Sequence, residues 1–259
     1  MGDNRLGRLP HTRKWKQVIA LIEGGAGTAE VAVATIDASK GGLAHAADDQ
    51  GLVYAFWLLT QVPLAARKEN FVGELRELGL DVSDSPSFME VVASFTDAVD
   101  AHLRHKGGRT DLGEMAEMAA AEALTAFAKP DTVGLFRTTD AEAKQALRKY
   151  ATQKQFGILA RGFFARLTKR YLTYFLSREL SNHVQSDGRF SNIDRHTEFN
   201  EALGVHCHQV SRIVEDFSGE WFSKTEYEGG ITPKKAAGFL YVAVEKIRKE
   251  LAKGGHANE

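Results

Sequence analysis

The chain has 259 residues, of which 43% are hydrophobic and 26% are charged, and its formal net charge is −1. This length suits one large domain or two modest ones, and the composition is that of a globular protein. The sequence pI of about 6.8 argues against a dedicated nucleic-acid module, because such domains are usually strongly basic throughout. The single cysteine, Cys207, excludes an intrachain disulfide and a cysteine-rich zinc site.

Cellular location is indicated by what the sequence does not contain. The basic N-terminal residues are not followed by an apolar run of the kind found in signal peptides. The longest apolar stretch, residues 52–66, contains Pro63 and falls short of the roughly 20 residues that cross a bilayer. We therefore expect a cytoplasmic protein with no membrane segment, in which residues 52–66 form a buried core helix.

Helix signals follow one another along the first half of the chain. Thr28 is a suitable cap for a helix that runs to about Ser39, and the next helix, from about Asp48, is expected to end at Pro63. The 3.6-residue period and the usual start and stop residues predict three more helices, which span residues 68–78, 86–106 and 110–129.

The second half of the chain is also expected to be helical. A helix over residues 140–150 continues or kinks into a long one that ends near Asn182. A further helix is predicted over residues 194–222, and Thr232-Pro233 opens the last one, which ends near Leu251. Because no alternating strand pattern is found, the predicted fold class is all-α, a multi-helix globular bundle.

Residues 128–139 contain Pro130, Gly134 and several threonines, which favours a joint between two parts of the chain. The predicted organisation is an N-terminal helical lobe, residues 1–130, and a C-terminal helical lobe, residues 131–259. A single domain that contains both lobes is the alternative.

Charge is segregated along the chain. Residues 144–178, the basic tract, contain nine Lys or Arg and no Asp or Glu, which gives a local charge of +9. Residues 81–122, the acidic region, contain nine acidic and three basic residues, which gives −6. Such segregation creates a field that attracts polyanions or an oppositely charged partner.

One stripe of the long predicted helix combines basic and hydroxyl side chains: Arg166, Lys169, Arg170, Thr173 and Ser177. Basic side chains bind phosphates, and the neighbouring Tyr171 and Tyr174 are suited to stacking on bases. We therefore predict nucleic-acid contact through Arg161, Arg166, Lys169, Arg170 and Tyr174. The alternatives are that this face docks on the chain's own acidic region or is simply solvated.

A second basic segment lies at the N-terminus and surrounds Trp15 with five cations: Arg5, Arg8, Arg13, Lys14 and Lys16. We expect this arm to hold a second stretch of a nucleic-acid backbone.

Residues 178–183 read Arg-Glu-Leu-Ser-Asn-His. An arginine followed after four residues by a histidine, near the end of a helix, resembles the Arg-x4–6-His signature of HEPN ribonucleases. The resemblance covers these six residues and the fold class, and Glu179 stands where that family often has Asn, Asp or His. It implies metal-independent RNA cleavage by Arg178 and His183 across a dimer interface. The alternative is that His183 complements the helix dipole and Arg178 is exposed.

Other site signatures are incomplete. His102 and His105 share a helix face without further ligands, while His206 and His208 would point about 200° apart on a helix. Cys207, between the latter two, falls on a core stripe. The glycines at 24–27 lack the Lys-Ser/Thr pair of a phosphate loop, and no Gly-x-Ser-x-Gly sequence occurs. We therefore expect no metal and no cofactor.

The function that we favour on these grounds is a non-enzymatic helical subunit that contacts nucleic acid or an acidic protein partner through the basic tract. A bacterial nucleic-acid-handling or defence assembly would suit such a subunit. A HEPN-like ribonuclease and a structural protein-interaction module are the alternatives. The expected partners are nucleic acid, another protein or a second copy of the chain, and not a membrane.

Overall fold

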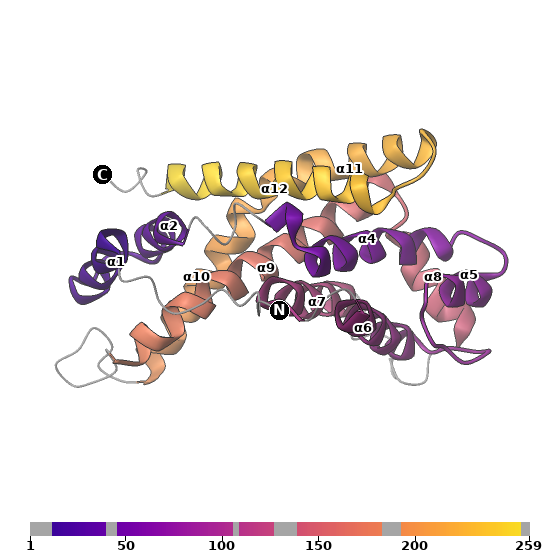
Figure 1. Ribbon diagram of the computed structural model, residues 1–259, viewed down its shortest axis with the longest axis horizontal. Coiled ribbons are helices and arrows are strands. Elements are labelled where there is room, and N and C mark those ends of the chain that lie inside the picture. The colour runs from indigo at the N-terminus through magenta and orange to yellow at the C-terminus, as the bar shows by residue number, and fades with distance from the viewer. Residues whose placement is uncertain (1–11, 40–45, 106–108, 127–138, 183–192, 255–259) are drawn as a thin grey trace.

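A computed structural model describes residues 12–39, 46–105, 109–126, 139–182 and 193–254. Within these residues there are eleven α-helices and one short 3-10 helix, and no strand (Figure 1). The predicted all-α fold is therefore confirmed. None of the helices described is long and apolar enough to cross a membrane.

The helices of the first half are α1 (Arg13–Glu23), α2 (Thr28–Ala38), η1 (Ala46–Asp48), α4 (Gln50–Ala65), α5 (Phe71–Glu77), α6 (Phe88–His105) and α7 (Asp111–Ala126). Those of the second half are α8 (Asp140–Lys149), α9 (Gln153–Asn182), α10 (Ile193–Val210), α11 (Arg212–Tyr227) and α12 (Pro233–Gly254).

Helix α9 runs through the middle of the molecule and packs against α7, α10 and α11. Figure 1 shows α12 along one long edge and α6 and α7 along the other, with α4 between them. Helices α1 and α2 lie at one end of the molecule, and α5 and α8 lie at the opposite end. The basic tract therefore spans two helices: Lys144, Arg148 and Lys149 lie on α8, and the rest of the tract lies on the central helix α9, most of whose surface is covered by other helices.

An aromatic cluster joins helices from both halves of the chain. The Phe56 ring of α4 stacks on Phe239 of α12, with centroids 5.2 Å apart, and lies 5.5 Å from the ring of Phe163 of α9. Trp221 of α11 lies 4.2 Å from Phe239. Large buried rings contribute strongly to core stability, so this cluster holds α4, α9, α11 and α12 together. The joint predicted at residues 128–139 lies outside the described residues.

Helix α4 continues past its proline, so the prediction that it ends at Pro63 is wrong. Pro63 lies in the last turn, where its missing N–H removes a single helical hydrogen bond. The N–H of Ala66 still donates to the carbonyl of Val62 at 3.2 Å. As predicted, residues 52–66 belong to the core, with Leu52 and Phe56 fully buried.

The single helix predicted over residues 194–222 is also wrong, because it is two helices that meet at Ser211. The N–H of Ser211 donates to Cys207, whereas the N–H of Val214 donates to Ser211 itself, at 3.0 Å, in a 3-10-type turn. The two helices differ in their neighbours: α10 packs on α2 and α9, and α11 packs on α9 and α12.

Candidate nucleic-acid interface

A groove runs between α7 and α9 and has a volume of about 440 Å³. Helix α9 contributes six of its lining residues: Arg166, Lys169, Arg170, Thr173, Tyr174 and Ser177. Helix α7 contributes Met115 and Glu122. All five residues of the predicted basic and hydroxyl stripe therefore face one surface feature, which we call the α7–α9 groove.

The stripe reaches solvent here, whereas most of the remaining surface of α9 is buried. Phe163, Phe164 and Leu172 are almost inaccessible to solvent and point into the core. A helix that is apolar over most of its circumference is covered on several sides, and its polar residues gather where it reaches water. Helix α7 packs closely on α9 and forms the other wall of the groove through Met115 and Glu122.

Two arginines of the groove share one carboxylate. Arg166 Nε lies 3.7 Å from Glu122 Oε2, and Arg170 Nη2 donates to Glu122 Oε1. The arginine side chains are 30% and 25% exposed, whereas that of Glu122 is 51% exposed. The carboxylate therefore sits closer to solvent than the two guanidinium groups that it neutralises. Burial lowers the pKa of Arg166, and Glu122 opposes this effect.

Lys169 differs from its arginine neighbours. Its side chain passes over Gly204 of α10, where an added Cβ atom would come within 3.0 Å of the Lys169 Nζ atom. Within the described part of the chain, its ammonium group forms no ion pair or hydrogen bond. Lys169 is therefore the cation of the groove whose charge is available to a ligand.

The two tyrosines of α9 have different environments. Tyr174 is half-buried, lines the groove and packs edge-on against Phe175 at 5.2 Å. Tyr171 is fully buried, and its hydroxyl donates to the carbonyl oxygen of Ser39 at 2.7 Å. The predicted stacking role of Tyr171 is therefore wrong, because helical spacing did not distinguish the groove from the adjacent core.

Arg161 lies outside the groove. Its Nη1 atom is 2.9 Å from Glu215 Oε2, and its Nε–H donates to the carbonyl of His208 at 3.1 Å. This side chain thus links α9 to α10 and α11, and only 22% of it is exposed. Arg161 is therefore not among the residues that line the α7–α9 groove.

The predicted N-terminal clamp is only partly described: Arg13, Lys14 and Lys16 of α1 are exposed, whereas the aromatic residue among them is buried. Trp15 is 3% exposed in α1, and its ring centroid lies 6.3 Å from that of Phe175. Lys14 pairs with Asp37 at 2.6 Å. Trp15 is a core residue, so its proposed place in a nucleic-acid clamp is wrong, while Arg5 and Arg8 lie outside the described residues.

The HEPN-like pair cannot be placed. Arg178 belongs to the last turns of α9. Its side chain and the whole of His183 lie outside what the structure describes. Cleavage by these two residues stays a prediction.

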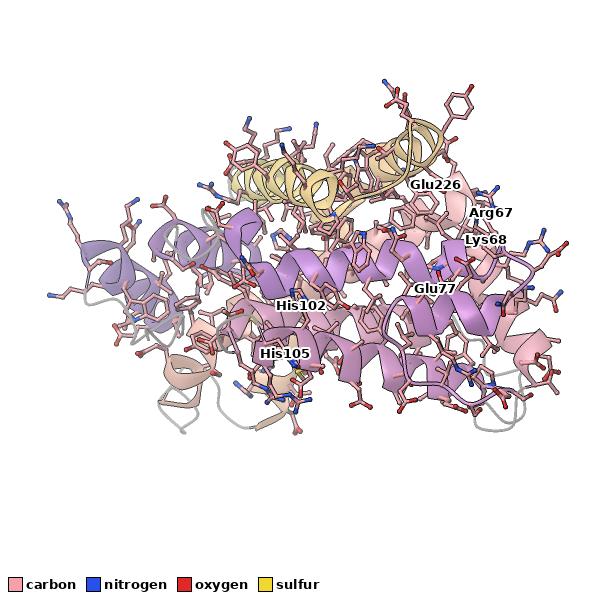
Figure 2. All side chains as sticks on the ribbon, turned by 45° about the vertical axis from the view of Figure 1, so that its right-hand side comes forward. Arg67, Lys68, Glu77, His102, His105 and Glu226 are labelled. Atoms are coloured by element: carbon pink, nitrogen blue, oxygen red, sulfur yellow. The ribbon has the colours of Figure 1, made fainter. Side chains whose placement is uncertain are left out.

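The histidines and the cysteine that were considered as metal ligands have separate environments. His102 stacks on Tyr54, with centroids 3.8 Å apart, while the Nδ1 atom of His105 lies 2.7 Å from the Ala101 carbonyl oxygen. Figure 2 shows both histidines on α6. Burial raises the pKa of the Cys207 thiol to about 12 and lowers the pKa of His206. In the described portions of the chain, no three His, Cys, Asp or Glu side chains are placed to hold a metal ion.

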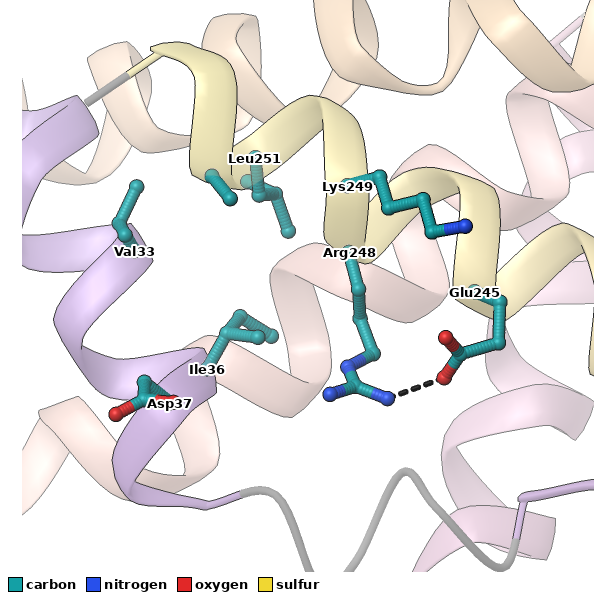
Figure 3. A pocket seen from close by; sticks show the side chains of 8 residues that line it. Val33, Ile36, Asp37, Glu245, Arg248, Lys249 and Leu251 are labelled. Atoms are coloured by element: carbon teal, nitrogen blue, oxygen red, sulfur yellow. Dashed lines mark hydrogen bonds and ion pairs between the residues drawn. The ribbon is translucent and has the colours of Figure 1, made fainter. Parts of the chain in front are cut away.

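A second hollow, of about 350 Å³, lies between α2 and α12 (Figure 3). Its walls include the apolar side chains Val33, Ile36 and Leu251. The guanidinium of Arg248 is held by Glu245, as the dashed line in Figure 3 marks. The acidic side chains Asp37 and Glu245 balance the basic side chains Arg248 and Lys249 in this lining, so the hollow carries no net charge and is less suited to a polyanion than the α7–α9 groove.

Met115 and Glu122 are the groove residues that sequence reasoning did not single out. Residues 81–122 were treated as one region of nine acidic and three basic residues, with docking of the basic face on it as an alternative, whereas its members form different contacts. Asp100 and Glu114 pair with Arg109 within that region, and Glu122 pairs with the basic tract. No local pattern in the sequence separates Glu122 from the other acidic residues of that region, because its pairing depends on how α7 packs on α9.

No protein family, no curated protein and no solved structure matches the chain.

Proposed function

We propose that this protein is a non-enzymatic binding subunit that holds single-stranded nucleic acid in the α7–α9 groove. The observation that supports this proposal most directly is the charge of the groove. Three cations and one carboxylate line it, a net charge of +2, and Lys169 has no ion-pair partner among the described residues. An accessory role in a bacterial nucleic-acid-handling or defence assembly is the setting that we propose for it.

The groove offers suitable chemistry for a phosphate backbone. Arginine presents a planar fork of N–H donors that fits a phosphate, and lysine provides a compact positive charge. The hydroxyl group of Thr173 adds a donor close to these cations. These groups would bind phosphates without reading base sequence, so we expect strong salt dependence and weak sequence preference.

The aromatic side chain in the groove favours a single strand over a duplex. Tyr174 lines the groove beside Arg170 and Thr173. Bases of a single strand are free to stack on an aromatic ring, whereas bases in a duplex already stack on one another.

The experiment is fluorescence anisotropy with an end-labelled oligouridine, at low and at physiological salt, on wild-type protein and two lysine variants. Lys169→Gln removes the unpaired cation of the groove. Lys154→Gln makes the same chemical change at an exposed position of the same helix, outside the groove. We expect a salt-sensitive rise for the wild type, roughly five- to tenfold weaker binding for Lys169→Gln, and little change for Lys154→Gln.

The other outcomes identify the alternatives. No anisotropy change at low salt contradicts nucleic-acid binding and leaves an acidic protein partner as the ligand of the basic tract. Equal losses in both lysine variants would mean attraction by overall charge and not by the groove. A rise followed by a decay would indicate cleavage, which the HEPN resemblance implies for Arg178 and His183.

A further inference from the structure

Glu122 occupies the place in the groove where a ligand phosphate would bind. It lies near the C-terminal end of α7 and contacts Arg166 and Arg170, two of the three cations that line the groove. A carboxylate and a phosphodiester group carry the same charge and accept hydrogen bonds from the same arginine fork. In this conformation both guanidinium groups therefore already hold an anion that belongs to the chain itself.

We infer that Glu122 is an internal competitor for phosphate that determines how many anionic groups a ligand must bring to the groove. This inference rests on the proposed function. It adds that the groove discriminates against single anions and admits strands that carry several adjacent phosphates.

The competition arises because Glu122 is tethered. A tethered group acts at a high effective concentration, so a single free anion competes poorly for the two arginines. The apparent affinity of any ligand that needs them equals the intrinsic affinity multiplied by the fraction of molecules in which Glu122 has moved away. Single phosphates and mononucleotides should therefore bind weakly.

The competitor is nevertheless displaceable. Half of the Glu122 side chain is exposed, and ion pairs at such positions contribute little to stability because water and salt screen them. A carboxylate so close to solvent can rotate outward without losing its hydration. The arginines, which are about one quarter exposed, would stay in place to receive the phosphate.

Lys169 explains why a strand can displace Glu122 from the arginines whereas a single anion cannot. Its ammonium group lies in the same groove and has no competitor among the described residues. A strand can bind Lys169 through one phosphate and then present the next phosphate to Arg170 in an intramolecular step. The first contact thus supplies the local concentration that displaces Glu122.

The test compares two charge-neutralising variants on α7. Glu122→Gln removes the competitor. Glu114→Gln is the matched control, because Glu114 lies two turns earlier on the same helix, is 47% exposed and pairs with Arg109 outside the groove. The affinity for end-labelled oligouridine is measured by anisotropy, and uridine monophosphate is then used as a competing ligand.

We expect Glu122→Gln to bind oligouridine about three- to tenfold more tightly than the wild type, and Glu114→Gln to stay within about twofold. Uridine monophosphate should compete measurably for the Glu122→Gln variant and poorly for the wild type. Replacing Arg170 by Gln should reduce affinity more in the Glu122→Gln background than in the wild type, because only there is the guanidinium free.

Each remaining outcome has a definite meaning. If the wild type and Glu122→Gln both fail to bind at low salt, the proposed function is wrong and the inference fails with it. If the wild type binds and Glu122→Gln binds equally well, the function stands and the internal competition is refuted. Equal gains from both glutamine variants would show a long-range charge effect and would also refute it. Matching circular-dichroism melting curves establish that the variants are folded.

Discussion

Gly219 of α11 faces the backbone of Gln153 at the start of α9, where an added Cβ atom would lie 2.3 Å from the Gln153 carbonyl oxygen. One turn further along α9, a Cβ atom on Gly157 would lie 2.9 Å from the carbonyl oxygen of Glu215. The two helices therefore touch backbone to backbone, through a glycine on each. This close approach also brings Phe156 and Phe222 into a stack with centroids 4.0 Å apart.

Gly219→Ala should destabilise the protein by roughly 1–3 kcal/mol, because the contact atom belongs to the backbone and cannot move aside as a flexible side chain can. Gly238→Ala is the control, since a Cβ atom at Gly238 of α12 meets nothing within 4 Å. That change should stabilise the protein by up to about 1 kcal/mol, through the higher helix propensity of alanine. Urea denaturation measures both, and equal effects of the two changes would contradict the packing argument.

The raised pKa of Glu117 predicts how the stability of the protein depends on pH. Burial, and next repulsion from Asp100, raise its pKa to about 7, although Arg109 opposes this. The folded state thus holds a proton that the unfolded state releases near pH 4.5, and the free energy of unfolding should fall as pH rises from about 4.5 to 7. Glu117→Gln should remove this loss and stabilise the protein by about 1–2 kcal/mol at pH 8, with little effect near pH 4.5.

A second glutamate provides the comparison. Glu90 accepts a hydrogen bond from the Ser83 N–H at 2.6 Å, which lowers its pKa. Its contribution to stability is present above its unfolded pKa and is lost as pH falls through the folded value, so Glu90→Gln should destabilise the protein at neutral pH and matter less in acid. Denaturation midpoints between pH 4 and 8 measure both variants. Parallel pH profiles for Glu117→Gln and the wild type would refute the role given to Glu117.

Local signals in the sequence predicted the helices well because they depend on neighbours along the chain. Thr110 was expected to begin a helix, and its Oγ1 atom accepts the N–H of Gly113 at 3.0 Å. The helix predicted to end at residue 78 is followed by Gly79, whose φ of +85° suits glycine. Cys207 was placed on a core stripe and is fully buried. The helix end predicted at Pro63 was wrong, because a proline in the last turn of a helix removes only one backbone hydrogen bond.

The candidate site was predictable only in part, because its composition depends on contacts between helices. The 100° rotation per residue correctly grouped Arg166, Lys169 and Arg170 on one stripe. It could not show that Tyr171, one position along, packs on Ser39, which lies 132 residues away in the sequence. Nor could it show that Glu122 pairs with the arginines. Such pairings are set by how α2, α7 and α9 pack, which a one-dimensional pattern does not contain.

Arg161 should prove structural and not part of the interface. Its pairing with Glu215 and the His208 carbonyl is mostly shielded from solvent, so Arg161→Gln should cost about 1–2 kcal/mol of stability. The same variant should bind oligouridine within about twofold of the wild type, since the side chain does not line the groove. Urea denaturation and anisotropy measure the two effects. A large loss of binding with unchanged stability would return Arg161 to the interface.

Tyr174 should affect binding, whereas Tyr171 should affect folding. Tyr174→Ala removes the ring on which we expect a base to stack, and base–aromatic stacking contributes about 1–3 kcal/mol, so affinity for oligouridine should fall by roughly fivefold or more. Tyr171→Phe keeps the buried ring but removes the hydroxyl that donates to Ser39, at an expected cost of about 1 kcal/mol of stability. Its oligouridine affinity should be that of the wild type.

Because Tyr174 also packs against Phe175, Tyr174→Phe is needed as a control, and it should retain most of the binding if stacking is the cause. Loss of binding in Tyr174→Phe, or its full retention in Tyr174→Ala, would argue against a stacked base in the groove.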